Sequence, residues 1–350
     1  MTQRALLDLS YEDLARVLAQ LGAPGYRTAQ VWRAAYVELV TDFDAITTLP
    51  SDLRARLAAG LSVAPLATVD AVSSPDGHTR KSVLEYADGE TVEVVTMEYP
   101  ERATVCVSSQ VGCAVGCPFC ATGQSGFVRD LATGEIAAQV LHAARELRGR
   151  GRRLSNVVFM GMGEPLLNAD AVLKAIHRLN DPRGFGLGAR AFTVSTAGVV
   201  PGIERLARDP VQVNLAVSLH AGEDGLRNAL VPLNRKYPLD ALLDACRHYL
   251  AATHRRITFE IVLAAGTNDR PHHARAVAER LSGILCHVNL IAANPIQGKR
   301  DLRPSPPAAV RDFAAILEAA GIPTTVRDSR GAEIAAGCGQ LRARPRGREP

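Results

Sequence analysis

The stretch GCAVGCPFC, residues 112–120, brings Cys113, Cys117 and Cys120 together in one short segment. Three residues separate the first pair and two separate the second, and the glycines and proline predict a loop. Thiolates this close together can face one centre, and they are soft ligands suited to zinc or to an iron–sulfur cluster. A structural zinc ion needs four protein ligands, whereas three ligands on a four-iron cube leave one iron open to a small molecule.

This spacing, with the aromatic Phe119 between the last two cysteines, resembles the signature of the radical S-adenosylmethionine (SAM) enzymes. In that superfamily the amino-acid end of SAM caps the open iron. The motif itself leaves two alternatives, a zinc knuckle whose fourth ligand lies elsewhere and simple coincidence. We predict that Cys113, Cys117 and Cys120 hold a [4Fe-4S] cluster and that SAM binds to it.

Composition places the chain among ordinary globular proteins. Of its 350 residues, 47% are hydrophobic and 22% are charged, and the length suffices for a catalytic domain with a smaller companion. No apolar run approaches the roughly 20 residues that span a bilayer, and the first residues do not resemble a signal peptide. We therefore expect a cytoplasmic protein with no membrane partner. An odd number of cysteines, seven, argues against a disulfide framework.

The net charge of +4 is compatible with an RNA partner but does not require one. Arginines cluster within residues 148–153 and again in a basic tail, residues 342–350, which we expect to be disordered. For each cluster the alternative to RNA binding is a solvated loop or chain end.

Hydrophobic periodicity distinguishes a helical region at the start of the chain from a strand-like region that follows it. Residues 1–65 resemble a small helical domain, containing the only tryptophan, Trp32, whose role is either packing or binding RNA. Residues 66–102 become strand-like, and the runs 82–86 and 91–95 predict a β-hairpin that links to the next domain.

Strand patterns alternate with helix patterns over residues 103–341. The alternation predicts βαβ units, a parallel sheet and an α/β fold, with about six units forming a partial or complete barrel. Barrels carry their chemistry at the carboxyl ends of the strands, and the cysteine loop follows the first expected strand. The expected strands are 103–107, 156–160, 191–195, 213–217, 257–262, 287–291 and 324–326, and the expected helices are 134–148, 170–179, 201–208, 239–252, 272–282 and 306–320.

The segment MGMGEP, residues 160–165, follows one of these strands. Glycines such as Gly163 let the backbone approach a ligand closely. Glu164 can accept hydrogen bonds from the ammonium group of a bound amino acid. The alternative is a tight turn with an exposed acid, but the position at a strand end favours ligand binding.

Polar residues occupy three further strand ends. They are Ser195, the run Ser218-Leu219-His220, and Asn294. Each is a weak signal alone, because serine commonly caps the following helix. Together they predict a ring of polar groups that would hold a nucleoside cofactor.

Two cysteines stand apart from the cluster loop and from the core. Cys106 precedes the loop, and Cys338 lies in a glycine-flanked segment near the C-terminus. The alternative is two ordinary free thiols. Cys246 and Cys286 fall in apolar patterns and are expected in the core.

In combination and order, these motifs resemble the RlmN/Cfr-type radical SAM RNA methyltransferases, over about residues 6–341. The chain is most similar to the members that methylate carbon 2 of an adenine in large-subunit ribosomal RNA. The motifs that carry the resemblance are CVSSQVGC (106–113), GMGEP (161–165), VSTAG (194–198), SLH (218–220), PLNRKYP (232–238) and CGQL (338–341).

The resemblance implies a partial (β/α)6 barrel with a helical, RNA-binding N-terminal domain. It implies ribosomal RNA of the large subunit as substrate and, for many members, the anticodon loop of transfer RNA. We also expect an electron-donor protein such as flavodoxin and a monomeric enzyme. Within the PLNRKYP motif, Asn234, Arg235 and Lys236 are expected RNA contacts.

The resemblance also implies a reaction scheme with two SAM molecules per turnover. Adenine carbon 2 is electron-poor and cannot simply attack the methyl group of SAM, so the family uses a radical. Cys338 first accepts a methyl group by polar displacement, and a 5′-deoxyadenosyl radical from the second SAM then removes hydrogen from it. The methylene radical adds to the adenine, Glu93 removes the ring proton, and Cys106 attacks the sulfur of Cys338 to form a transient disulfide and free the base.

Some features keep alternatives open. Without the positional match, Glu93 would be an exposed strand carboxylate. The segment after Asn294-Pro295 lacks an aromatic residue that the family often has, and Gly337 replaces a more usual alanine. Methylation at adenine carbon 8, as in antibiotic resistance, would use the same residues, and the third possibility is a non-catalytic, zinc-stabilised RNA-binding protein.

Overall fold

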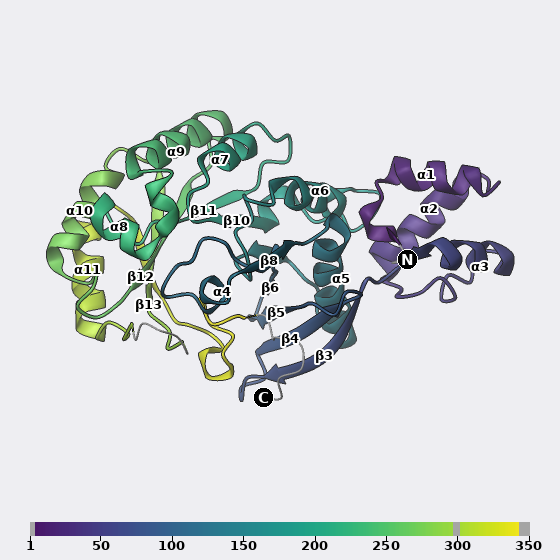
Figure 1. The fold of residues 1–350 in the computed structure, drawn as a ribbon, viewed down its shortest axis with the longest axis horizontal. Coiled ribbons are helices and arrows are strands. Elements are labelled where there is room, and N and C mark those ends of the chain that lie inside the picture. Colours follow the sequence, from purple (N-terminus) through teal and green to yellow (C-terminus); the bar gives the residue numbers. More distant parts are fainter. Residues whose placement is uncertain (1–3, 297–301, 343–350) are drawn as a thin grey trace.

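The computed structural model describes residues 4–296 and 302–342. The disordered tail expected over 342–350 lies outside these ranges except for Arg342. A ten-stranded sheet of order β14-β13-β12-β11-β10-β9-β6-β5-β4-β3 forms the body of the molecule (Figure 1). Its edge strands β3 and β14 stay unpaired with each other, so the sheet is open within the described residues.

Seven parallel strands form one part of this sheet, from β6 to β14, and helices alternate with them along the chain. The predicted α/β partial barrel is therefore confirmed, because each predicted strand and helix appears within a few residues of its expected bounds. The strands are β6 (Ala103–Cys106), β9 (Asn156–Phe159), β10 (Phe192–Thr196), β11 (Asn214–Ser218), β12 (Ile257–Leu263), β13 (Cys286–Ala292) and β14 (Thr324–Arg327), and the main helices are α5 (Thr133–Gly149), α6 (Ala169–Asn180), α7 (Val200–Ala207), α9 (Leu239–Thr253), α10 (Pro271–Leu281) and α11 (Pro307–Ala319).

An antiparallel extension continues the sheet beyond β6. It consists of β3 (Leu66–Ser73), β4 (Thr79–Tyr86) and β5 (Thr91–Glu98). The β4–β5 hairpin was expected from the sequence, whereas β3 was not singled out, because its exposed residues lack a clear alternation. The extension matters for the site because β5 pairs directly with β6, the strand that leads to the cysteine loop.

The N-terminal helices are α1 (Tyr11–Gln20), α2 (Tyr26–Arg33) and α3 (Ser51–Gly60), which lie beside α5 and α6 in Figure 1. Trp32 is buried and packs edge-on against Tyr11, with ring centroids 5.6 Å apart. Arg148 of the predicted basic cluster donates to the carbonyl of Val37 at 2.7 Å. That arginine therefore fastens α5 to this helical region.

The cysteine loop is framed by a small hairpin of β7 (Gln110–Gly112) and β8 (Phe127–Asp130). Gly112 has φ +75°, and a Cβ atom there would lie 2.0 Å from the carbonyl oxygen of Gly126. No larger residue fits without moving the strand. Gly116, inside the loop, has φ +74° but no neighbour within 4 Å of a Cβ position.

These two glycines make a matched pair for a stability test. We expect Gly116→Ala to cost about 1–2 kcal/mol, the strain of a left-handed residue. Gly112→Ala adds overpacking to the same strain and should cost about 2–5 kcal/mol in total. Urea unfolding of both variants measures the difference in the free energy of unfolding. Equal losses of stability would show that the β7–β8 hairpin shifts at little cost to make room for a side chain at position 112.

Candidate active site

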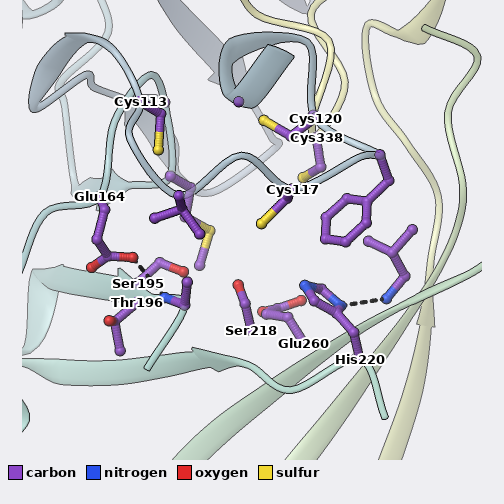
Figure 2. A pocket seen from close by; sticks show the side chains of 18 of the residues that line it. Cys113, Cys117, Cys120, Glu164, Ser195, Thr196, Ser218, His220, Glu260 and Cys338 are labelled. Carbon is purple, nitrogen blue, oxygen red and sulfur yellow. Dashed lines mark hydrogen bonds between the residues drawn. The ribbon is translucent and has the colours of Figure 1, made fainter. Parts of the chain in front are cut away.

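One cavity collects most of the residues that the sequence predicted, at the carboxyl ends of the parallel strands (Figure 2). It encloses about 990 Å³ of space, which includes solvent-open space at its mouth. The predicted residues that line it are Cys113, Cys117, Cys120, Gly163, Glu164, Ser195, Ser218, His220, Asn294 and Cys338. Leu219 is fully buried in the hydrophobic core instead, so its side chain is not part of this lining.

The three loop cysteines face this cavity together. Burial raises the pKa of the Cys113 thiol to about 12, and it raises the pKa of Cys117 well above the ordinary value. Iron would have to displace these protons, as thiolate ligation always requires. In the described part of the chain, no three His, Cys, Asp or Glu side chains meet at a point suited to a single metal ion. An iron–sulfur cube is larger than one ion, so its three corner ligands stand further apart.

Glu164 bridges two segments at the cavity wall. Its Oε2 accepts from the Ala197 N–H at 2.6 Å, and its Oε1 accepts from the Leu166 N–H at 3.0 Å. Burial raises its pKa to about 7, although these hydrogen bonds act in the opposite direction. The exposed acid of the alternative interpretation is therefore excluded, and a bound ammonium group would favour the ionised carboxylate.

His220 adopts an unusual backbone conformation, φ +61°, which a non-glycine residue keeps only where the surroundings enforce it. Its Nδ1 accepts from the Val262 N–H at 3.0 Å, which assigns the ring proton to Nε2. The ring packs edge-on against Phe119 with centroids 4.6 Å apart. Burial lowers its pKa to about 3, so the imidazole is a neutral donor beside the cysteine loop.

The C-terminal segment that carries Cys338 docks on the cysteine loop. The Ala121 N–H donates to the carbonyl of Gly339 at 2.7 Å, and the Asn294 side chain donates to the carbonyl of Cys338 at 3.0 Å. A Cβ atom at Gly337 would lie 2.8 Å from Asn294 Nδ2. The glycine that departs from the family pattern therefore allows this close approach.

A second cavity shares Met160, Ile291 and Cys338 with the first, and Cys106 also lines it. Cys338 thus lines both cavities, and the residue is exposed. The surrounding protein raises the pKa of its thiol. Burial raises the pKa of Cys106 to about 12, so its thiol is protonated at rest. The structure thereby brings together two cysteines that the sequence singled out separately.

Glu93 lies on β5, within the strand expected over residues 91–95. Its side chain is 3% exposed and pairs with Lys81 at 3.1 Å, which excludes the alternative of an exposed strand carboxylate. Among the described residues, Glu93 is absent from the lining of both cavities. It is instead bonded to the end of the Cys338 segment, where its Oε2 accepts from the Arg342 N–H at 3.0 Å.

The expected RNA contact at Asn234 is wrong. Asn234 is buried, accepts from Arg227 at 2.6 Å and donates to Asp224 at 2.7 Å. Its amide therefore organises the loop around Arg227, a fully buried arginine below the strand ends. Arg235 and Lys236 remain exposed.

Sequence reasoning missed Glu260, in the middle of β12. Its side chain is 9% exposed and lines the cavity with the three cysteines (Figure 2). Oε1 accepts from Asn289 at 2.9 Å, whereas Oε2 is buried without a hydrogen-bond partner among the described residues. The available signal was a lone acid in the otherwise apolar strand ITFEIVL.

Comparisons with known proteins fit this geometry. The family profile described as "Radical SAM superfamily" matches residues 107–277, and the profile "Ribosomal RNA large subunit methyltransferase N-terminal domain" matches residues 4–63. A crystal structure titled as a radical SAM methyltransferase from Sphaerobacter thermophilus is 52% identical. It superposes with a TM-score of 0.95 over 97% of this chain and 99% of its own. The chain has the fold of a radical SAM enzyme.

Two curated relatives show which family of radical SAM enzymes the chain resembles. Both are described as "Probable dual-specificity RNA methyltransferase RlmN". The one from Chloroflexus aurantiacus is 48% identical, covering 98% of this chain and 94% of its own length. The one from Frankia alni is 50% identical, covering 99% and 84%. The chain belongs to the RlmN family of radical SAM RNA methyltransferases. In the ranges 4–296 and 302–342, no helix is both long and apolar enough to cross a membrane.

Glu260 gives a stability test of the site. Burial raises its pKa, so the ionised carboxylate costs stability, and this cost grows as the pH rises above the ordinary range of a glutamate. We expect Glu260→Gln to stabilise the ligand-free protein by about 1–3 kcal/mol at pH 7 and by much less at pH 4. Urea unfolding at both pH values measures this, with the exposed Glu85→Gln on β4 as control. A loss of stability at pH 7 would mean that the ion pair with Arg327, whose Nη1 lies 3.7 Å from Glu260 Oε1, outweighs the cost of burying the carboxylate.

Proposed function

We propose that this protein methylates carbon 2 of an adenine in large-subunit ribosomal RNA and, as a dual-specificity enzyme, in transfer RNA. The observation that carries the proposal is that Cys338 lines both cavities, one with the three loop cysteines and one with Cys106. A sulfur in that position can receive a methyl group on one side and deliver a one-carbon unit on the other. Methylation at carbon 8 would use the same residues, but the dual-specificity relatives favour carbon 2.

The residues present fit the cofactors that the family implies. Three thiols with one shared cavity suit a [4Fe-4S] cluster, because soft thiolates are the ligands such clusters take. When bound, the cluster and SAM supply a carbon-centred radical, with two SAM molecules consumed per turnover. The polar residues of the same cavity would hold SAM: Gly163, Glu164, Ser195, Ser218, His220, Asn294 and the unpaired oxygen of Glu260. Leu219 would act only by placing its neighbours Ser218 and His220, because its own N–H and carbonyl are hydrogen-bonded to Glu260, Ala221 and Arg227.

Within this scheme the protein residues have distinct roles. The thiolate of Cys338 accepts a methyl group, because a thiolate is a strong nucleophile. The thiol of Cys106 later attacks that sulfur, which forms a disulfide and releases the modified base. Glu93 accepts the proton from the adenine ring, and Lys81 Nζ lies 3.1 Å from its carboxylate in this structure. Because Glu93 is bonded to the Cys338 segment, this segment must shift before the proton can reach it.

The partners follow from the same proposal. The helical domain of residues 1–65, joined by residues 66–102 to the barrel of residues 103–341, would grip RNA, and the exposed Arg235 and Lys236 would contact phosphates. An electron-donor protein such as flavodoxin would reduce the cluster. We place the enzyme in the cytoplasm as a monomer, where its RNA substrates are found.

Two cysteine variants test the proposal. We expect Cys338→Ala to lose all methylation of ribosomal and transfer RNA while keeping the iron and sulfide of the cluster. Cys106→Ala should accumulate protein covalently joined to RNA, because the step that frees the base is missing. Iron analysis and mass spectrometry of digested RNA after anaerobic reaction provide the measurements.

The buried Cys286→Ala on β13 is the matched control, since Cys286 lines neither of the two cavities in the described chain. It should methylate RNA at the wild-type rate. Turnover by Cys338→Ala, or loss of its cluster, would refute the role of Cys338. A colourless protein that retains zinc instead of iron would refute the radical chemistry as a whole.

The role of Glu260 gives a binding test. A carboxylate oxygen without a partner is suited to accept hydrogen bonds from the ribose hydroxyls or the amines of SAM. We expect Glu260→Gln to weaken binding of S-adenosylhomocysteine about tenfold, the loss of one charge-assisted hydrogen bond. Isothermal titration of the reconstituted protein measures the change, and Glu85→Gln should bind as the wild type does. Unchanged binding would place Glu260 outside the SAM contacts.

A further inference from the structure

The loop that carries Cys338 is fastened at both ends to two neighbouring strands. At one end, the carbonyl of Ala335 accepts from Lys81 Nζ at 3.1 Å. At the other end, the Arg342 N–H donates to Glu93 Oε2 at 3.0 Å. Lys81 belongs to β4 and Glu93 to β5, so the antiparallel extension of the sheet holds both ends of this loop.

The two anchoring side chains also bind each other. Lys81 Nζ lies 3.1 Å from Glu93 Oε1, and the side chains are only 9% and 3% exposed. Lys81 lies opposite Val95, and Val95 lies opposite Cys106 on the next strand. Since residues in one cross-strand row share a face, the pair and Cys106 occupy the same side of the sheet.

Burial of the Lys81 and Glu93 charges costs free energy, because both groups lose their contact with water. A buried ion pair gives little net stability, and removal of one partner leaves the other charge uncompensated. Here each charge has a second use, because Lys81 donates to one loop end and Glu93 accepts from the other. Hydrogen bonds that involve a charged group are stronger than neutral ones, so the loop ends are held firmly.

We propose that the Lys81–Glu93 pair is a clamp that positions Cys338 between the two cavities. This role of the clamp rests on the proposed function, in which the sulfur of Cys338 reacts in both cavities and must therefore be held at their boundary. Lys81 is thus a positioning residue, which acts on the reaction through the loop and has no contact with either cavity in the described structure.

The clamp also couples proton transfer to loop movement. When Glu93 takes the ring proton, its negative charge is lost, and both the ion pair with Lys81 and the hydrogen bond from Arg342 weaken. The loop is then loosened at the stage when the sulfur of Cys338 must meet Cys106. Proton transfer to Glu93 would therefore come before the movement of the Cys338 loop, because the loss of the Glu93 charge is what loosens the loop.

Hydrogen–deuterium exchange of the anaerobic holoenzyme tests the clamp directly. In Lys81→Met, we expect the amides of residues 336–342 to exchange about ten- to a hundredfold faster, the effect of losing hydrogen bonds to a charged group. Lys81→Arg keeps the charge and should restore most of the protection. Lys174→Met, at an exposed position on α6, should leave this segment unchanged.

Two readouts separate positioning from general destabilisation. The amides of the core strand β10 should keep wild-type exchange in Lys81→Met, and the ratio of 5′-deoxyadenosine to methylated RNA should rise because radicals form without a well-placed acceptor. Should Lys81→Met fail to fold, the double variant Lys81→Met/Glu93→Gln removes both buried charges and should still show fast loop exchange.

Wild-type exchange in residues 336–342 of folded Lys81→Met, or of the folded double variant, would overturn the clamp. Equally faster exchange in β10 would overturn it as well, because the effect would then be general. Neither result depends on catalysis. Failure of the proposed function itself would be recognised separately, as a wild-type protein that never methylates RNA.

Discussion

The hydrogen bond from the Ala121 N–H to the Gly339 carbonyl joins the cysteine loop to the C-terminal segment. The other features of the site depend on this contact, because it brings Cys338 over the cavity that the three loop thiols line. Without it, the cavity would keep its three loop cysteines and its polar strand ends but would lack the sulfur of Cys338. The hydrogen bond from the Asn294 side chain to the Cys338 carbonyl holds the same segment, and Gly337 leaves room for this side chain.

An open sheet makes this docking possible. A closed barrel would pair its first and last strands, whereas here β6 pairs with β5 of the antiparallel extension. The extension supplies Lys81 and Glu93, which hold the two ends of the Cys338 loop. The hairpin that the sequence presents as a simple linker is therefore bonded directly to the loop that carries Cys338.

Much of the fold and site could be predicted because the signals are local. Alternating strand and helix patterns predict βαβ units, and polar residues such as Ser195 and His220 at strand ends are brought together by the geometry of parallel strands. The surroundings of Glu93 could not be predicted, since its partner Lys81 lies on another strand and only the pairing register shows that they meet. Asn234 was misjudged for a related reason, because a polar side chain in a loop gives no sign that an arginine is buried beside it. Glu260 lies within a strand, where a single acid is easily taken for a surface residue.

The fate of hydrogen on the transferred methyl group decides whether Cys338 carries a radical. The enzyme is given SAM with a fully deuterated methyl group, and the methylated adenosine from the RNA is analysed by mass spectrometry. If hydrogen is removed from the methyl on Cys338, the product methyl keeps two deuterium atoms, and the third appears in 5′-deoxyadenosine. A product that keeps all three deuterium atoms would mean direct transfer from SAM and would contradict the role assigned to Cys338.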